Sequence, residues 1–310
     1  MIIHNDLNKF FAKNPVVSVG MFDGVHIGHM HIVDRLRQIA TEIQGETVLI
    51  TFSPHPRLFF NPHDKNLQLL NSFDEKIELI EKSGLDHLLI IPFTADFANL
   101  TSCQFIENIL VKKLRISQLI VGYNHRFGKN REGNFQNLEK CASIFNFRIE
   151  KLGEIKIENE TISSTLIRQT LKSGDLSRAK KYLNYRYFIN GTVTDGHKIG
   201  RKLGFPTANI KIDDENKLLP ENGVYAVEAF LEGKKYFGML NIGTRPTFSK
   251  NEQIKTIEVH IFNFRENIYM KKIKLIFIEK IRNEKRFEDS KQLIVQLEKD
   301  RKSVIQILNN

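Results

Sequence analysis

Apolar residues in the first 180 positions alternate between short continuous runs and longer stretches with helical spacing. The runs are β-branched and aliphatic, as strands buried in a parallel sheet are, and they cover Val16–Val19, Thr47–Phe52, Leu88–Phe93 and Leu119–Tyr123. Between the runs, two apolar faces have helical spacing, one of Val33, Leu36, Ile39 and Ile43 and the other of Ile106, Ile109, Leu110 and Leu114. Thr101 and Gln104 form a capping box before the second helix. Repeated strand–helix–strand units predict an α/β fold, a mostly parallel sheet with helices on both faces and ligands at the carboxyl ends of its strands.

The pattern changes after Asn184. Short strand-like segments follow one another without intervening helices, and they cover Phe188–Thr194, Gly223–Leu231, Tyr236–Leu240, Lys255–Phe262 and Lys272–Ile278. Turn signals such as Glu232-Gly233 separate them. This arrangement predicts an antiparallel barrel or sandwich. One helix closes the chain, with Leu293, Leu297, Val304 and Leu308 on one stripe.

Composition narrows the class of protein. The 310 residues suit two domains at ~150 residues each, and 41% hydrophobic residues with 26% charged residues can form a buried core. No apolar run approaches the ~18 residues of a membrane span, and the first residues lack the pattern of a secretory signal. Two cysteines, Cys103 and Cys141, exclude a disulfide scaffold and most cysteine-based metal sites. We therefore expect a cytoplasmic globular protein.

The net charge of +10 allows two interpretations. A basic surface can bind an anionic partner such as a nucleotide, a nucleic acid or a membrane. However, lysine pairs such as Lys112–Lys113 and Lys271–Lys272 are spread along the chain rather than massed in one block. The charge alone therefore favours solvated surface lysines over nucleic-acid binding.

The sharpest motif is VVSVGMFDGVHIGHMHIV, in which a strand leads through a glycine-containing turn into a helix that begins near Gly28. Glycines allow the backbone to approach a ligand, and a helix N-terminus attracts phosphate. His26 and His29 can both face that phosphate as donors, which indicates nucleotidyl transfer. Two other interpretations stay open: a metal cluster of the two histidines with His31, or three structural polar residues.

Several motifs together resemble a known family. GMFDGVHIGH, TFSPHP (51–56), VGYNHRFGKNREGN (121–134) and ISSTLIR (162–168) resemble the N-terminal half of the prokaryotic bifunctional riboflavin kinase/FMN adenylyltransferases. GTVTDGHKIGRKLGFPTANI (191–210), GVYAV (223–227), NIGTRPTF (241–248) and IEVHIFNF (257–264) resemble their C-terminal half. The resemblance covers nearly the whole chain in the family's order. It implies a Rossmann-like nucleotidyltransferase domain over residues 1–184 and a riboflavin kinase domain, an antiparallel β-barrel with a terminal helix, over residues 185–310.

For the first half, the resemblance implies adenylylation of FMN by ATP, giving FAD and pyrophosphate. FMN already carries an anionic nucleophile, so no general base is needed, and His26 and His29 would serve the α-phosphate. The remaining implied residues are Gly20, Phe22, Gly24, Asn124, Ser163, Ser164 and Arg168 for ATP, and Pro54, His55 and Pro56 for flavin. Read alone, the serines and Arg168 are equally an ordinary helix cap with a solvated arginine. Leu166 stands where many relatives carry arginine.

For the second half, the loop GRKLGFPTAN (200–209) leads into a strand. Thr207 and Asn209 can offer oxygen ligands to Mg²⁺ and hydrogen bonds to ATP, although Pro-Thr-x-Asn alone is ordinary turn chemistry. Glu258 lies among apolar neighbours, where a carboxylate is badly placed for stability unless the position is an exposed edge. The resemblance implies that Glu258 is the general base for the 5′-hydroxyl of riboflavin, which attacks the γ-phosphate of MgATP. Asn263 and Met270 stand where relatives commonly have Asp and Gly.

The expected partners are therefore small molecules, namely riboflavin, FMN and ATP with Mg²⁺, and neither a nucleic acid nor a membrane. We expect a monomer or a transient homo-oligomer.

Two alternative functions stand against this interpretation. An aminoacyl-tRNA-synthetase-like enzyme would suit the histidine pair and the charge, but no K-M-S-K-S segment is present. The second alternative is a basic nucleic-acid-binding or regulatory module that has kept the fold but lost the catalytic activity. Such a module would not need both the histidine pair and the set of Thr207, Asn209 and Glu258, and both are present.

Overall fold

The computed structural model describes the chain except residues 63, 65–66, 124, 126–127, 130–132, 196–199, 201–202, 247–252 and 310. The chain forms two compact units, one of Met1–Gln68 with Phe73–Ser164 and one of Leu69–Ser72 with Thr165–Asn310. The second unit thus includes two helices, α7 (Ser164–Lys172, from its second residue) and α8 (Leu176–Leu183), that precede residue 184. The domain boundary at 184 stays a prediction about where the two functions divide.

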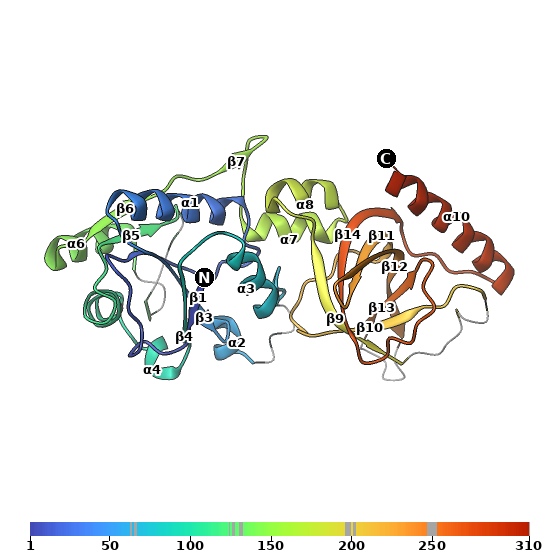
Figure 1. Cartoon of the computed structure of the whole chain (residues 1–310), viewed down its shortest axis with the longest axis horizontal. Helices are drawn as coiled ribbons and strands as arrows, with labels where there is room; N and C mark the ends of the chain where they lie inside the picture. The colour runs from blue at the N-terminus through green and yellow to red at the C-terminus, as the bar shows by residue number, and fades with distance from the viewer. Residues whose placement is uncertain are drawn as a thin grey trace. The chain divides into compact units, whose positions relative to one another are not determined.

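A parallel sheet of six strands forms the centre of the first unit (Figure 1). Its strands are β1 (Ile2–His4), β2 (Val16–Val19), β3 (Thr47–Ser53), β4 (His87–Pro92), β5 (Gln118–Val121) and β6 (Arg148–Lys151), in the order β1-β4-β3-β2-β5-β6. Every neighbouring pair is parallel. The α/β prediction is therefore confirmed, and the two strands that it missed, β1 and β6, lie at the edges.

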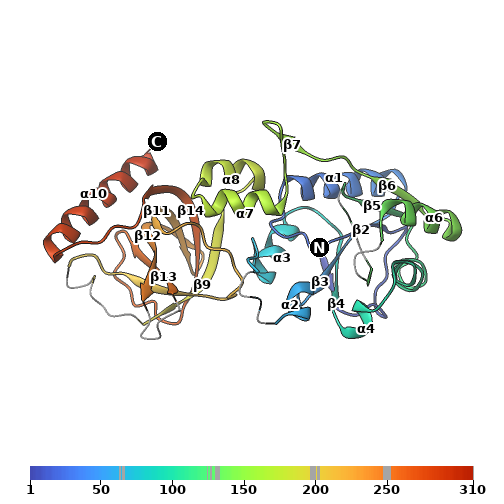
Figure 2. The same cartoon turned by 180° about the vertical axis from the view of Figure 1, so that it is seen from behind.

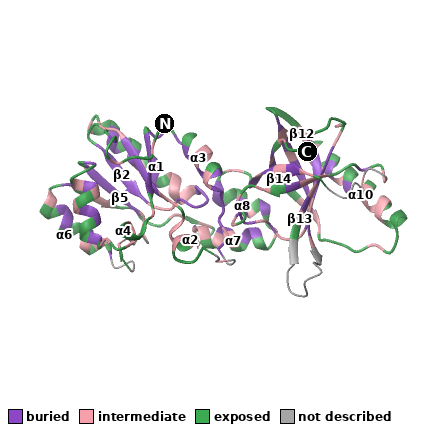
Figure 3. Ribbon diagram, turned by 90° about the horizontal axis from the view of Figure 1, so that it is seen from below, coloured by how far each residue is buried: buried purple, intermediate pink, exposed green. Residues whose placement is uncertain are grey.

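Side chains of successive strand residues enter two different cores. Val17, Val19 and Ile50 join one cluster, whereas Val16 and Leu49 join the other. This alternation buries both faces of the central strands, so β2 and β5 appear as buried ribbons in Figure 3. A sheet buried on both faces explains why the strands are continuous apolar runs in the sequence.

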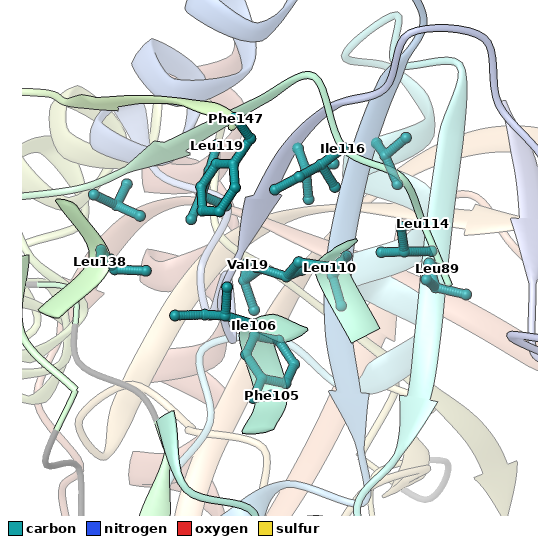
Figure 4. Close-up of a cluster of buried hydrophobic side chains, with 14 of the residues drawn as sticks. Val19, Leu89, Phe105, Ile106, Leu110, Leu114, Ile116, Leu119, Leu138 and Phe147 are labelled. Carbon is teal, nitrogen blue, oxygen red and sulfur yellow. The ribbon is translucent and has the colours of Figure 1, made fainter. Parts of the chain in front are cut away.

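Helices cover each face of the sheet. The helices of this unit are α1 (Ile27–Glu42), α2 (Pro56–Phe60), α3 (Phe73–Glu81), α4 (Ala95–Ala98), α5 (Ser102–Phe105), the π-helix η1 (Ile106–Val111) and α6 (Phe135–Phe145), and a short hairpin pairs β7 (Lys156–Ile157) with β8 (Glu160–Thr161). Helices α1 and α3 pack on the Val16 side. Helices α5, η1 and α6 pack on the other side, and their side chains interlock around Val19 in Figure 4. Figure 2 shows α6 beside β6.

The capping box predicted at Thr101 is present. Thr101 Oγ1 accepts from the Gln104 backbone N–H, and Gln104 Oε1 accepts from the Thr101 N–H. The α-helix lasts one turn before the backbone continues as η1, which still buries Ile106 and Leu110. Cys103 on α5 and Cys141 on α6 are free thiols, with their sulfurs 3.8 Å apart.

The second unit contains a closed antiparallel barrel, as the sequence predicts. Its strands are β9 (Phe188–Thr194), β10 (Ala208–Ile212), β11 (Gly223–Leu231), β12 (Lys234–Pro246), β13 (Gln253–Ile261) and β14 (Lys272–Arg282), closed in the order β10-β13-β12-β11-β14-β9. The predicted turn at Glu232-Gly233 joins β11 to β12, with both residues at positive φ. Strand β12 extends beyond the predicted Tyr236–Leu240 at both ends.

The terminal helix α10 (Ser290–Asn309) packs on the outside of this barrel (Figure 1). Val304 is fully buried in a cluster with Val224, Ala226 and Met239 from the strands. A fork of hydrogen bonds fixes the helix, because Arg282 on β14 donates from Nε and Nη2 to both oxygens of Asp300 at 2.7–3.1 Å. In the part of the chain that the structure describes, no helix combines the length and apolarity needed to cross a bilayer.

The Arg282–Asp300 pair gives a stability prediction. Asp300 is 1% exposed, so Asp300→Ala leaves the guanidinium of Arg282 without its buried counter-charge. We expect the free energy of unfolding to fall by about 3 kcal/mol in urea titrations followed by circular dichroism. Lys272→Ala is the control, because its pair with Asp213 is solvent-exposed and is worth less than about 1 kcal/mol. Equal losses from the two variants would contradict the role given to the buried pair.

Candidate active sites

Strand order places the first candidate site at the carboxyl end of β2. This strand lies between β3 and β5, and the chain builds the sheet outwards through β3 and β4 before it crosses to β5 on the other side. Such a reversal of strand order opens a crevice at the carboxyl ends of the two strands, where parallel sheets bind ligands. The motif with the histidine pair follows β2 directly. Asn124, in the loop after β5, lies outside the described residues.

The loop between β2 and α1 turns through left-handed backbone. Phe22, Gly24 and Val25 all have positive φ, at 51°, 92° and 38°. Only Gly24 adopts such a conformation without steric cost, so the two non-glycine residues are held there by their surroundings. The Phe22 side chain is buried in the core beside α1, and a Cβ on Gly20 would lie 3.2 Å from its ring. The ring of Phe22 thus belongs to the core, and its predicted role at ATP stays a prediction.

His26 and His29 lie together at the start of α1. Their rings stack with centroids 3.6 Å apart, and the edge of Phe22 packs against His29 at 5.2 Å. Gly28 allows this stack, because a Cβ there would lie 3.2 Å from the His26 ring. His31 is exposed further along the helix, and the described residues contain no group of three His, Cys, Asp or Glu side chains placed to hold a metal.

The electrostatics of the pair favour a neutral imidazole. Burial, His26 and the ammonium of Lys76 together hold the pKa of His29 well below its ordinary value. Its Nδ1 is buried and has no hydrogen-bond partner within the described ranges. At pH 7 His29 therefore acts as a hydrogen-bonding group rather than as a cation.

The predicted serine segment reaches this loop through Ser164, the first residue of α7. Ser164 Oγ donates to the backbone carbonyl of Asp23 at 2.8 Å, which joins ISSTLIR to the histidine loop. Arg168 follows one turn later along the helix and is half-buried. Leu166, where relatives carry arginine, is half-buried, and its carbonyl accepts from Thr170 Oγ1. The structure thus brings Ser164 to the site, and the role of Arg168 stays a prediction.

The predicted flavin loop follows β3. His55 caps helix α2 by accepting from the Arg57 backbone N–H through Nδ1, and Pro56 is the first residue of that helix. Pro54 is exposed. Beyond the loop lies a cluster of phenylalanine rings in edge and tilted contact at 5.1–6.0 Å, consisting of Phe52, Phe59, Phe60, Phe93 and Phe97. Phe60 is 70% exposed, so an aromatic surface is available beside this loop.

The second candidate site is a row of polar residues across four strands of the barrel. Asn209 on β10 lies opposite Glu258 on β13, which lies opposite Asn241 on β12; on the other side, Asn209 pairs with Thr194. Residues directly opposite one another project on the same face of a sheet. Ile257 and Val259 are buried, so Glu258 belongs to the outer face. The edge-strand explanation of Glu258 is wrong, because β13 is bonded on both sides in a closed barrel.

Thr207 lies just before β10 and is exposed, two residues from Asn209. The preceding carbonyl, of Pro206, accepts from Nδ1 of His260 at 2.7 Å. His260 lies two residues beyond Glu258 on the same face of β13, and burial and Arg301 lower its pKa although this bond opposes them. A neutral, buried His260 therefore fixes the start of the Pro-Thr-x-Asn segment next to Glu258.

The two departures from the family pattern share a backbone feature. Asn263 and Met270 both have positive φ, at 54° and 63°. Aspartate, asparagine and glycine tolerate this region, whereas methionine enters it at a steric cost of about 1 kcal/mol. The Asp and Gly that the family resemblance implies at these positions would meet the same backbone requirement. Met270 is 79% exposed, so it contributes no core packing in return.

Three residues of these sites were not singled out from the sequence: Lys76, Asn241 and His260. Lys76 carries a signal, because it falls on the inward stripe of α3 with Phe73, Ile77 and Ile80. His260 shares the two-residue period of Glu258, and Asn241 begins the NIGTRPTF motif. Their contacts, however, join segments far apart in the sequence.

Known families match both halves of the chain. Residues 9–166 match the FAD synthetase family and residues 183–308 match the riboflavin kinase family. A bifunctional riboflavin kinase/FMN adenylyltransferase of Buchnera aphidicola subsp. Schizaphis graminum is 39% identical over 96% of this chain and 95% of its own. The protein of that name from Bacillus subtilis is 35% identical over 99% of this chain and 96% of its own.

A solved structure shares the fold. The crystal structure described as a macrolide-efflux protein from Streptococcus pneumoniae superimposes with a TM-score of 0.87, at 26% identity over 98% of each chain. That name concerns the streptococcal protein, and the likeness supports the architecture of both units. Taken with the family matches to each half and the identity along nearly the whole length, it confirms the resemblance read from the motifs: the chain belongs to the bifunctional riboflavin kinase/FMN adenylyltransferase family.

Proposed function

We propose that the first unit adenylylates FMN at the histidine loop and that the barrel phosphorylates riboflavin at the polar row. One observation carries the proposal. Each unit holds a separate set of groups, and each set suits the nucleophile of its own reaction. The stacked pair of His26 and neutral His29 offers hydrogen bonds without a strong base, whereas the barrel offers the carboxylate of Glu258. A phosphate nucleophile is already anionic and needs hydrogen-bond donors but no base, whereas an alcohol needs a carboxylate that accepts its proton.

In adenylyl transfer, a phosphate oxygen of FMN attacks the α-phosphorus of ATP, and the bond to pyrophosphate breaks. His26 and His29 donate hydrogen bonds to the α-phosphate as its charge is redistributed. The helix N-terminus and the backbone at Gly20, Phe22 and Gly24 face the same phosphates.

Other residues hold the leaving group and the flavin. Ser163, Ser164 and Arg168 stabilise the pyrophosphate, and Asn124 contacts ATP from the loop after β5. The isoalloxazine ring binds at Pro54, His55 and Pro56, where the exposed Phe60 adds an aromatic surface.

In phosphoryl transfer, Glu258 accepts the proton of the riboflavin 5′-hydroxyl. The resulting oxygen attacks the γ-phosphorus of ATP, and ADP leaves. Thr207 and Asn209 supply hard oxygen donors of the kind that Mg²⁺ prefers, and Asn209 lies opposite Glu258 in the sheet. When bound there, Mg²⁺ would neutralise charge on the ATP phosphates.

The wider expectations belong to the same proposal: Mg²⁺ and ATP at both sites, a cytoplasmic location, and small-molecule partners only, in a monomer or transient homo-oligomer. The family matches to both halves of the chain support the two reactions. The net charge of +10 would suit both alternatives, the synthetase-like enzyme and the nucleic-acid-binding module, but neither explains why each unit carries its own set of polar site residues.

Separate sites predict separable activities. His29→Ala should lower FAD formation at least 100-fold, because a transition-state donor is lost, while FMN formation is retained. Glu258→Gln should lower FMN formation by about 10²- to 10⁴-fold and spare the conversion of supplied FMN to FAD. Both are measured by chromatography of flavins after incubation with MgATP. His31→Ala, on an exposed position of α1, is the control and should change neither rate. If either site variant loses both FMN formation and the conversion of FMN to FAD, the proposal of two separate sites is contradicted.

The histidine stack predicts a glycine requirement. Gly28→Ala places a methyl group 3.2 Å from the His26 ring and should displace the stack, lowering FAD formation by about 10- to 100-fold. Gly153→Ala is the matched control, since a Cβ there meets nothing within 4 Å. If Gly28→Ala is as active as Gly153→Ala, the stacked arrangement is not required for the reaction.

A further inference from the structure

Lys76 is a buried lysine at the histidine loop. It lies on α3, on the stripe that packs inward with Phe73 and Ile80, and it is 6% exposed. Its ammonium lies 5.0 Å from the centre of the Phe73 ring. Burying an ammonium is unfavourable unless polar or charged groups compensate it. The surroundings of Nζ therefore indicate what the residue does.

Two hydrogen bonds join Lys76 to the ends of neighbouring strands. Nζ donates to Thr51 Oγ1 near the end of β3 at 3.1 Å and to the backbone carbonyl of Met21 at 3.3 Å. Met21 stands between Gly20 and Phe22, where the loop enters left-handed backbone. Thr51 is fully buried. Lys76 thus holds the loop at the residue where its unusual turn begins.

Lys76 also sets the charge at the site. Its ammonium interacts electrostatically with the carboxylate of Asp23, on the same loop, and with the His29 ring, on α1. The ammonium helps to keep His29 neutral. Because His29 then carries no charge, the ammonium of Lys76 adds positive charge beside a neutral ring.

We propose that Lys76 is a positioning residue for adenylyl transfer, which fixes the Met21 carbonyl and, in its protonated form, adds the positive charge that attracts the phosphates of ATP to the loop. This inference rests on the proposed function of the first unit. It makes ATP recognition there depend on one amine that does not belong to the histidine motif.

The protonation of Lys76 gives the proposal a distinctive pH dependence. Burial lowers its pKa to about 8, and Asp23 only partly opposes this. Below pH 8 the amine is charged and above it is neutral, so kcat/KM for ATP should fall as the pH rises through 8. Carboxyl and imidazole groups ordinarily titrate at about 4 and 6.5, well below this range. The profile of kcat/KM reports the free enzyme, in which this pKa applies.

The test compares FMN adenylylation by the full chain and its variants between pH 7 and 9.5. Lys76→Met keeps most of the packing but removes the charge. It should raise KM for ATP about 10-fold or more at pH 7 and abolish the decline near pH 8. Lys76→Arg stays charged throughout, so it should retain more affinity than Lys76→Met and show a flat profile. Lys82→Met is the control, because Lys82 forms an exposed pair with Glu78.

Riboflavin phosphorylation by the same preparations reports whether each variant is folded. A Lys76→Met protein with unchanged KM for ATP overturns the proposal. If that variant fails to fold, the wild-type profile decides, and a constant kcat/KM from pH 7 to 9.5 overturns the proposal equally. His29→Ala separates this failure from that of the proposed function, since its loss of FAD formation does not depend on Lys76.

Discussion

Alternation of side chains along a strand is the constraint on which both halves of this protein depend. In the sheet, both faces are covered, so both sets of side chains must be apolar, as Val16 and Val17 show by entering different cores. In the barrel, the interior takes only every second residue. Ile257 and Val259 fill it, and Glu258 is thereby directed to the outer face. The candidate site residues therefore lie beyond the strand ends in the first unit and on the outer face of the barrel in the second.

This constraint also explains what the sequence could predict. Continuous and alternating apolar runs indicate whether both faces of a strand or only one face is buried. The strands β2, β9 and β11 therefore have the predicted bounds. The edge strands β1 and β6 are not predicted from the apolar pattern. Ile2–His4 and Arg148–Lys151 pair through backbone hydrogen bonds and expose much of their side-chain surface. The predicted helix over 106–114 is partly a π-helix, a difference that apolar spacing alone does not reveal.

Site residues divide in a similar way. The motif of His26 and His29 indicates phosphate chemistry by its local pattern, whereas Thr207 and Asn209 are predicted site residues mainly because of the family resemblance. Lys76 and His260 act through backbone carbonyls of distant segments, at Met21 and Pro206. Such bonds leave almost no trace in the sequence near either partner. Their burial and partners emerge only when the strands are assembled.

Both candidate sites place a buried side chain that binds a backbone carbonyl next to the predicted site residues. Lys76 holds the loop that carries the histidine pair, and His260 holds the segment that carries Thr207. In each case a buried nitrogen fixes one carbonyl, which limits the freedom of a turn that must meet phosphate. In the proposed function, one of these supported turns serves a phosphate nucleophile and the other serves an alcohol.

Isotope transfer from labelled ATP tests the two-reaction account most directly. The full chain is incubated with riboflavin and MgATP labelled at either the α- or the γ-phosphorus, and FMN and FAD are separated and counted. The account predicts that the γ-label enters FMN and persists in FAD, whereas the α-label enters FAD alone. An FMN that carries the α-label, or an FAD that lacks either label, would contradict it.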